Sequence, residues 1–407
     1  MRHIGIIGAG QAGLYLGFSL IEAGYRVTLF AERSPEEIFN SQPSALAVLF
    51  SDALELERNL GLDFWSDEFD GCEQFLCQAY DSEGNLLLKF SSAIEKPWQA
   101  IDQRLKFSLW MQEFVRRGGE LIVKTVTIAD LEECAKKYDL VVVAGGRGEI
   151  SRLFERDKKK SIHNQPKRHL AGIIIKNHSV SQKTFKLANL PGIGEIIQTT
   201  FFHKYQIPTT AIGFEAYPGG MMDRFSQVQN GQELLAIAKE TIKQFLPGDY
   251  ELIKDSELAD PQGWLRGAVT PTVRKPVAYL PSGAMVMGIG DAVILNDPIC
   301  GQGANSATKM SKLVTQRIIE VGQGSFEPTW IEAVFEEFWQ YSQYVNAYAD
   351  CLLEPPAHLP KILMAMAENP AIVTDYLNGV NHPPALSPWF FKPDAAEQYL
   401  AKKNLLI

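Results

Sequence analysis

The chain begins with a strand–glycine loop–helix–strand unit, and this unit restricts the fold more than any other part of the sequence. A short β-branched run, residues 3–7, leads directly into Gly8-Ala9-Gly10-Gln11-Ala12-Gly13. An apolar-periodic helix is expected over residues 14–23 and a second strand over residues 26–30. Glycines at this spacing allow a tight turn, close approach of the backbone to a pyrophosphate and close packing of the helix on the strand. The sequence therefore predicts a Rossmann-like dinucleotide-binding domain.

An acid that binds the adenosine ribose follows such a loop by about 20 residues. Glu32 lies at about this distance, with Arg33 beside it, although Ala31 holds the position where this acid often ends the second strand. We therefore expect Glu32 or a neighbour to bind the ribose. The unit by itself is compatible with FAD and with NAD.

A second glycine-rich segment lies far along the chain. A strand ends in Gly290-Asp291, and a loop with Asp297-Pro298 leads to Gly301-Gln302-Gly303-Ala304-Asn305, where a helix reaching about Val321 begins. A carboxylate at a strand end can accept hydrogen bonds from ribityl hydroxyls, and a helix N-terminus can face the anionic end of an isoalloxazine ring. Alone, Gly290-Asp291 could be an ordinary turn. Together, the two motifs indicate a long ligand held between them, which favours FAD.

These motifs resemble those of flavoprotein monooxygenases of the aromatic-hydroxylase fold, and most closely the oxygenase component of two-component styrene and indole monooxygenases. The string Gly290-Asp291, Asp297-Pro298 and Gly301 to Asn305 is the most specific part of the resemblance. Further similar segments lie at residues 32–35, 64–69, 100–105, 138–143 and 267–274, so the resemblance covers nearly the whole chain.

The resemblance implies an enzyme that uses reduced FAD (FADH2) and O2. A flavin C4a-hydroperoxide would epoxidise or hydroxylate a small apolar aromatic or alkene substrate, with no protein acid or base required. The implied cofactor-binding residues are Gly8, Ala9, Gly10, Gln11, Ala12, Gly13, Glu32, Arg33, Arg104, Val126, Ala144, Gly145, Gly290, Asp291, Pro298, Gly301, Gly303, Ala304 and Asn305.

The resemblance also implies a substrate pocket. Its expected residues are Ala47, Leu49, Ser51, Trp98, Phe201, Pro298 and Ile299. Styrene-type members tend to carry Asn, Val and His at the first three positions, and indole-type members Ser, Gln and Met, so this chain matches neither set. Trp98 stands where a small residue is usual, which indicates a reshaped pocket. Ala47 and Leu49 could equally be core residues.

Single-component hydroxylases of this fold typically carry Asp-Gly-x-x-Ser-x-x-Arg after the third strand of the nucleotide domain. Here Arg147 stands in place of the Asp and Phe154 in place of the final Arg, and no second GxGxxG occupies a strand–helix unit. We therefore expect a separate flavin reductase to use NADH and to supply FADH2 by diffusion. The alternatives are a single-component NAD(P)H-dependent hydroxylase and a non-catalytic FAD-binding protein.

The expected organisation is an α/β (α+β) fold of three parts. A discontinuous FAD-binding domain of the glutathione-reductase/aromatic-hydroxylase type covers residues 1–70, 97–164 and 266–330, and a helical C-terminal segment covers 331–407. A mostly β substrate-binding domain covers 71–96 and 165–265, with strands at 172–175, 195–202 and 209–214 and a helix at 232–245. A further strand is expected at 119–126, where adenine commonly docks in this fold. The aromatic residues after Glu327 are expected to pack on the core.

Composition excludes several other classes of protein. The chain has 48 acidic and 39 basic residues and a net charge of −9, which disfavours nucleic acid and anionic membrane surfaces as partners. The 5 cysteines form no CxxC pair and the 7 histidines no cluster, so we expect reduced cytoplasmic thiols and no metal site. No apolar run is long enough to span a membrane. A homodimer is compatible with the sequence.

Overall fold

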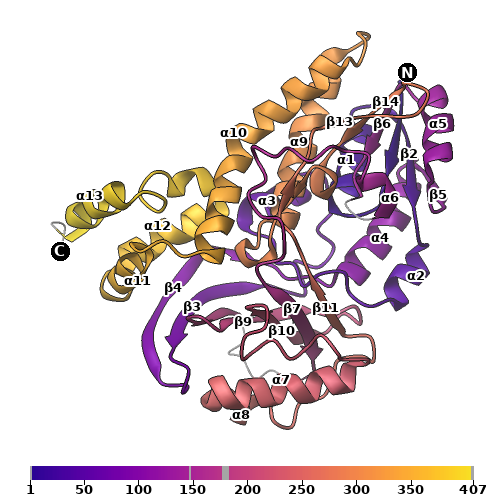
Figure 1. The fold of residues 1–407 in the computed structure, drawn as a ribbon. Coiled ribbons are helices and arrows are strands. Elements are labelled where there is room, and N and C mark those ends of the chain that lie inside the picture. Colours follow the sequence, from indigo (N-terminus) through magenta and orange to yellow (C-terminus); the bar gives the residue numbers. More distant parts are fainter. Residues whose placement is uncertain (1, 146–147, 177–182, 405–407) are drawn as a thin grey trace.

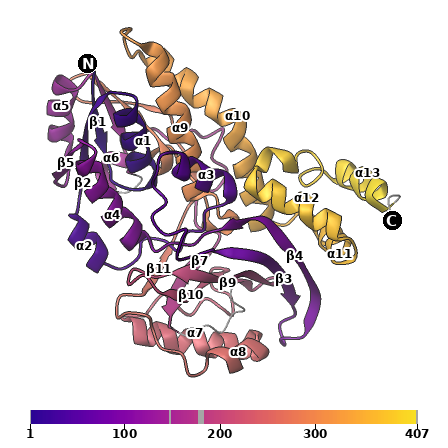
Figure 2. The same ribbon diagram turned by 180° about the vertical axis from the view of Figure 1, so that it is seen from behind.

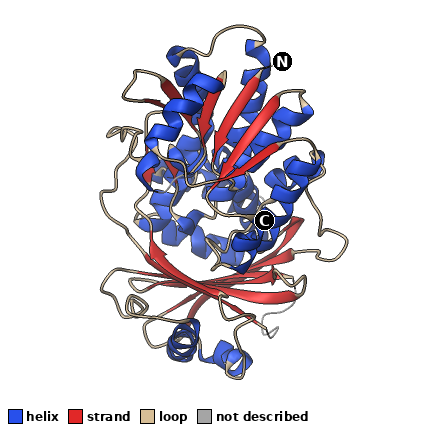
Figure 3. Ribbon diagram, turned by 90° about the vertical axis from the view of Figure 1, so that its right-hand side faces the viewer, coloured by secondary structure: helices blue, strands red, loops and turns tan. Residues whose placement is uncertain are grey.

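The computed structural model describes residues 2–145, 148–176 and 183–404. Two β-sheets lie one above the other with helices between and around them, and a set of helices extends to one side (Figures 1 and 3). The chain termini lie far apart, on opposite sides of the molecule (Figure 2). Mixed parallel and antiparallel sheets with a helical C-terminal region confirm the predicted fold class.

The first sheet has the order β13-β14-β6-β1-β2-β5, and its pairs are parallel except for β13 with β14. Every residue of β6 and the last four residues of β1 are buried. Parallel strands covered on both faces have this continuous apolar character. The strands are β1 (His3–Ile7), β2 (Arg26–Ala31), β5 (Glu120–Val123), β6 (Leu140–Val143), β13 (Val277–Tyr279) and β14 (Met285–Gly288).

The second sheet has the order β11-β7-β10-β9-β8-β3-β4, and only β3 pairs in parallel, with β8. Helices α7 (Gly231–Phe245) and α8 (Pro247–Ile253) lie on its outer side (Figure 1). The strands are β3 (Cys72–Tyr80), β4 (Leu86–Trp98), β7 (His169–Ile175), β8 (Thr184–Leu190), β9 (Gly194–Phe202), β10 (Pro208–Ala216) and β11 (Trp264–Ala268). A separate pair joins β12 (Thr272–Val273) to β15 (Ile294–Leu295).

The remaining helices cover the first sheet and form the C-terminal region. They are α1 (Gln11–Glu22), α2 (Pro35–Asn40), α3 (Ser51–Asn59), α4 (Gln103–Arg116), α5 (Ile128–Lys137), α6 (Gly148–Ser151), α9 (Gly303–Val321), α10 (Pro328–Leu353), α11 (Leu359–Glu368), α12 (Pro370–Asn381) and α13 (Pro393–Asn404). Three short 3-10 turns are η1 (Gly290–Ala292), η2 (Pro298–Cys300) and η3 (Pro383–Leu386). None of the helices in the described ranges is long and apolar enough to cross a membrane.

The observed elements agree with the sequence except at one strand end. Strands β7, β9 and β10 and helix α7 lie at the predicted positions, and Phe335 and Phe338 of α10 pack into the main core as expected. The strand predicted over residues 119–126 is wrong at its end, because β5 stops at Val123. The Thr127 side chain caps α5, which turns the chain, so Val126 lies in the connecting loop. The division into domains stays a prediction.

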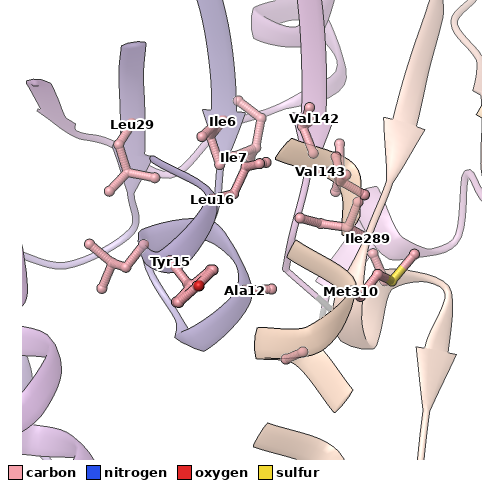
Figure 4. Close-up of a cluster of buried hydrophobic side chains, with 14 of the residues drawn as sticks. Ile6, Ile7, Ala12, Tyr15, Leu16, Leu29, Val142, Val143, Ile289 and Met310 are labelled. Carbon is pink, nitrogen blue, oxygen red and sulfur yellow. The ribbon is translucent and has the colours of Figure 1, made fainter. Parts of the chain in front are cut away.

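The main core joins the first strands to both glycine motifs. Figure 4 shows Ile6 and Ile7 of β1 beside Val142 and Val143 of β6, with Ile289 on the other side. Ala12 of α1 and Met310 of α9 belong to the same buried cluster. The loops that connect these elements are therefore anchored in a close-packed interior.

Gly13 is the glycine whose replacement most directly disturbs this packing. A β-carbon at Gly13 would lie 1.9 Å from the Gly8 carbonyl oxygen. We expect Gly13→Ala to destabilise the chain by roughly 1–3 kcal/mol or more, because backbone must move. Gly10→Ala is the matched control, because a β-carbon at Gly10 meets no atom within 4 Å. Urea unfolding measures both, and equal stabilities of the two variants would contradict the predicted close packing.

Candidate functional site

The loop between β1 and α1 is built for a ligand at the helix N-terminus. Gly8 has a φ of +114°, a conformation that favours glycine, and a β-carbon there would lie 2.9 Å from the Gly145 nitrogen. Gly10 is the N-cap of α1, and no side chain caps this helix. The free N–H groups of α1 and the open space at Gly10 therefore fit a phosphate group.

The second glycine motif lies directly against the first. Gly290 of η1 has a φ of +55°, and a β-carbon there would lie 2.9 Å from the β-carbon of Ala12. Ser311 of α9 donates a hydrogen bond of 2.9 Å from its hydroxyl to the Ala12 carbonyl oxygen. Gln11 donates from its side-chain amide to Thr308 of α9, at 2.8 Å. The structure thus brings together the two motifs that the sequence predicts to share one ligand.

A cavity of about 200 Å³ begins at the first glycine loop and extends along the end of β2. Glu32 and Arg33 follow β2 directly, and both line this cavity with Gly8, Ala9 and Gly10. Glu32, which is predicted to bind the ribose, and the loop that is predicted to bind phosphate therefore line the same cavity. The other lining residues are Ala31, Ile38, Ser41, Gln42, Ser44, Gln103, Arg104 and Phe107.

Arg104 lines the same cavity, but its guanidinium group is held within the protein. It donates to Asp102 at 2.7 Å and to Asp260 at 2.9 Å, and its side chain is only 2% exposed. His203 lies 2.8 Å from the same Asp260 oxygen. Burial alone would raise the pKa of Asp260, but the hydrogen bonds from His203 and Arg104 hold it below its usual range. Arg104 therefore forms one wall of the cavity as part of a buried ion cluster.

Asn305 connects the second glycine motif to the segment expected to touch substrate. The Phe50 backbone N–H donates to its side-chain oxygen at 2.8 Å, and its side-chain amide donates to the Val48 carbonyl oxygen at 3.0 Å. The same amide donates to the Gly301 carbonyl oxygen at 2.8 Å. The Asn305 side chain thus fixes the backbone on both sides of Leu49, a contact that the sequence did not predict.

The two glycines before and at the start of α9 differ in how much space surrounds them. A β-carbon at Gly303 would meet no atom within 4 Å, whereas at Gly301, with a φ of +64°, it would lie 3.1 Å from the Phe50 ring. Ala304 packs partly buried beside Leu49. Pro298 is exposed and Ile299 half-buried in η2. The start of α9 therefore has open space at Gly303, which fits the prediction that the isoalloxazine ring lies there.

The expected substrate residues lie in and beside an aromatic cluster. Trp98 is 3% exposed, and its ring centroid lies 4.7 Å from that of Phe50 and 5.5 Å from that of Phe185. Phe201 is fully buried in the same cluster. Leu49 is buried and bridges to Gln99, whereas Ala47 is half-buried and Ser51 begins α3. Trp98 thus fills space between the second sheet and the C-terminal helices.

Other predicted cofactor residues lie around the edge of the first sheet. Ala144 and Gly145 follow β6, and a β-carbon at Gly145 would meet no atom within 4 Å. Asp291 is exposed in η1, and its carbonyl oxygen accepts from Arg274 at 3.2 Å. Phe154 packs against Gly288 in the core, with 2% exposed surface. The predicted contribution of Arg147 lies outside the described residues.

The sequence did not reveal a buried charge pair beneath the first loop. Glu57 of α3 pairs with Lys106 of α4, and Gln11 donates to the same Glu57 oxygen at 2.6 Å. Burial raises the pKa of Glu57 and lowers that of Lys106, although each attracts the other's charge. A charged residue at a helix position that faces the core could have indicated a buried ion pair. The partner could not be identified, because Glu57 and Lys106 lie far apart in the sequence. In the described part of the chain, no group of three or more His, Cys, Asp or Glu side chains could hold a metal ion.

Comparisons with known proteins agree with this geometry. Residues 146–251 match the family model "Styrene monooxygenase A putative substrate binding domain". The chain is 26% identical over 411 residues to "Styrene monooxygenase StyA" of Pseudomonas fluorescens, covering 98% of this chain and 97% of that protein. A second such protein, from Pseudomonas sp, is also 26% identical.

Solved structures show the same fold. The flavin-dependent brominase Bmp2 is similar with a TM-score of 0.69 at 17% identity, over 98% of this chain and 100% of that one. Aklavinone-11 hydroxylase, in a ternary complex with FAD and aklavinone, has a TM-score of 0.59 at 16% identity, over 90% of this chain and 70% of that one.

The similarity to styrene monooxygenases over nearly the whole chain supports a flavin-dependent monooxygenase with FAD as the cofactor. Within this class, the resemblance to the oxygenase component of styrene monooxygenases is confirmed over nearly the whole chain. The chain is thus similar to StyA, by the family model over residues 146–251 and by the relatives over 98% of its length.

Gly10→Val tests the pyrophosphate contact. The side chain would occupy the open space at the α1 N-terminus, so we expect loss of FAD binding while the chain still folds. Flavin fluorescence titration measures binding, and circular dichroism checks the fold. Retained flavin binding in the folded variant would count against the location of the cofactor.

Asp291→Ala tests the ribityl contact. Loss of a carboxylate hydrogen bond typically costs about 1.5–3 kcal/mol, or roughly 10- to 150-fold in the dissociation constant of reduced FAD. Asp291 is exposed, so the substitution leaves the core intact. Asp291→Asn is the control and should bind more tightly than the alanine variant. Anaerobic titration with reduced FAD gives both constants, and an unchanged constant in Asp291→Ala would show that the residue only shapes the turn.

Proposed function

We propose that this chain epoxidises or hydroxylates a small apolar aromatic or alkene substrate, styrene- or indole-like, with O2 and FADH2 supplied by a separate flavin reductase. The observation that carries the proposal is the convergence of the two glycine motifs, with open space at Gly10 and at Gly303. Together with the cavity lined by Glu32, these positions fit FAD. Reduced FAD bound there supplies the two electrons with which O2 delivers one oxygen atom to the substrate and leaves the other as water.

Each part of the site has a distinct task in this proposal. The N–H groups of α1 bind the pyrophosphate, and Glu32 binds the ribose. Asp291 holds the ribityl chain, and the N-terminus of α9 faces the pyrimidine edge of the ring. Asn305 keeps the backbone around Leu49 in place. The protein binds and orients its ligands and supplies no nucleophile.

The apolar surroundings of the second motif support the class of substrate. Trp98, Phe201 and Cys300 belong to one buried cluster, and Ile299 packs against it. Such an environment excludes water from a reactive oxidant and favours an apolar molecule over a charged one. Trp98 restricts the space beside Phe50, so we propose that it selects among apolar substrates by size.

The electrons are proposed to come from a separate flavin reductase and not from NAD(P)H bound to this chain. Phe154 fills core space beside Gly288, so an arginine side chain for NAD(P)H is not available at this position. This part of the proposal rests on the similarity to styrene monooxygenases, which covers 98% of the chain. Free FADH2 is proposed to reach the site by diffusion.

The purified chain should oxidise NADH at no more than the background rate, even with FAD present. An unrelated flavin reductase, or chemically reduced FAD with O2, should start oxygenation of styrene, indole or a thioether, because only reduced flavin is required. NADH absorbance and product chromatography measure the two steps. If the chain alone consumes NADH quickly and substrate accelerates that consumption, the single-component hydroxylase takes the place of this proposal. No oxygenation with any source of FADH2 would favour a non-catalytic FAD-binding protein.

A further inference from the structure

A second, much smaller cavity lies behind the turn η2, away from the glycine loops. Its volume is about 20 Å³, enough for one water molecule. Its polar lining comes from four separate parts of the chain, which are the loop before β7, strand β12, the residues after β15 and helix α10. These polar lining residues are Lys160, Ser161, His163, Thr272, Asn296, Asp297, Asn346 and Asp350.

Two amide groups that line this cavity lack a hydrogen-bond partner among the described residues. They are the side-chain nitrogen of Asn296, a residue that is 9% exposed, and the side-chain oxygen of Asn346. Unpaired buried amides are costly, and a water molecule can accept from one while donating to the other. The lining of the cavity therefore offers one water molecule both a donor and an acceptor.

Asp297 forms the inner wall of the cavity, where it belongs to a group of buried acids. It is 1% exposed and caps η2 by accepting from the Ile299 N–H at 3.1 Å. Glu215 of β10 is 6% exposed, and one of its carboxylate oxygens has no hydrogen-bond partner among the described residues. The neighbouring Glu195 is already paired with Arg168, at 2.8 Å. Arg168 thus pairs with Glu195, and among the described residues no ion pair holds Glu215 or Asp297, so burial favours a protonated carboxyl in this group.

The pKa shifts of these two acids agree with a proton retained in this group. Burial raises the pKa of Asp297 to about 6 and that of Glu215 well above its usual value, and Asp297 and Glu195 add to the effect on Glu215. The charged and titratable groups that face this acid pair or line the cavity are Glu195, Arg168, His163, Cys300, Asp350 and Lys160.

The outer wall of the cavity reaches solvent. The His163 side chain is 5% exposed, and its Nε2 lies 2.8 Å from the Oδ1 of Asp350. The Asp350 side chain is 34% exposed on α10. His163 and Asp350 both line the cavity, so this hydrogen-bonded pair joins the cavity to solvent.

We propose that this cavity binds one water molecule that joins Asp297 to His163, so that protons pass between the buried carboxyl pair and solvent at Asp350. The role of this path rests on the proposed function. FADH2, O2 and substrate S give FAD, SO and water, so two electrons leave the flavin and two protons enter the water formed. Reduced FAD that arrives as its anion lacks one of these protons. The path supplies that proton beside Pro298, which is predicted to border both the cofactor and the substrate.

The water site is tested without flavin. A crystal structure of the full chain at high resolution should show one ordered water in contact with Asn296 and Asn346 and with Asp297 or His163. A dry cavity, or a direct hydrogen bond between the two asparagines, would overturn the proposal.

The retained proton is tested by the pH dependence of unfolding, also without flavin. Because the folded-state pKa values of Asp297 and Glu215 are raised, the contribution of each to stability is full below its unfolded value of about 4 and is lost as pH rises toward the raised folded value, which is about 6 for Asp297. Glu215→Gln removes the part of this loss that comes from Glu215 and leaves the part that comes from Asp297. The ratio of wild-type to variant unfolding constants should therefore rise roughly 10- to 100-fold between pH 4 and pH 7. Glu257→Gln, at an exposed ion pair with Lys176, is the control and should give a flat ratio. A flat ratio for Glu215→Gln would overturn the retained proton.

The path itself is tested by His163→Gln, which keeps a polar side chain but cannot carry the proton. In single turnover with chemically reduced FAD, the proton-dependent return of oxidised flavin should slow by up to about 100-fold and recover with added imidazole. The solvent deuterium isotope effect should rise. An unchanged rate and isotope effect would overturn the path. If wild type oxygenates no substrate, the proposed function fails, while the water site and the retained proton are still decided by the two flavin-free experiments.

Discussion

The contact between α1 and α9 determines where the other parts of the site lie. Gly290 lies against Ala12 with no room for a β-carbon, and Ser311 of α9 holds the Ala12 carbonyl oxygen. The N-termini of two helices from distant parts of the sequence are thereby brought to one place. Both carry partial positive charge, so their proximity favours an extended ligand with negative charge at two points. Gln11 extends the same contact to Glu57, which connects α3 and α4 to the arrangement.

A buried ion cluster fixes the first sheet relative to the second. Arg104 begins α4, whereas Asp260 and His203 come from segments that flank strands of the second sheet. The Asp102 backbone N–H also donates to the Phe202 carbonyl oxygen at the end of β9. Breaking a buried ion pair by removing one partner typically costs about 3–5 kcal/mol. The cluster therefore stabilises both the cavity wall at Arg104 and the contact between α4 and the second sheet.

The sequence predicted those features that depend on local spacing. Strand, loop and helix positions around Gly8 to Gly13 and Gly301 to Asn305 follow from glycine spacing and hydrophobic periodicity, and the structure has them there. The end of β5 was misplaced because Thr127 and Asp130 form a capping box that competes with strand extension. In the site, spacing cannot show which distant group a polar side chain will meet. The partners of Arg104 and Asn305, and the cavity beside Asp297, depend on contacts between segments that only the folded chain brings together.

The hydrogen bonds of Asn305 have a consequence for how such an enzyme can change during evolution. They go to backbone atoms of Val48 and Phe50 and to that of Gly301, so they are indifferent to the side chain at position 49. Mutation at Leu49, a predicted pocket residue, changes that side chain and leaves in place the hydrogen bonds that hold its backbone segment. Ligand preference can therefore change while the backbone held by Asn305 stays the same. A chain with these backbone hydrogen bonds can acquire new ligand preferences by single substitutions while its architecture is conserved.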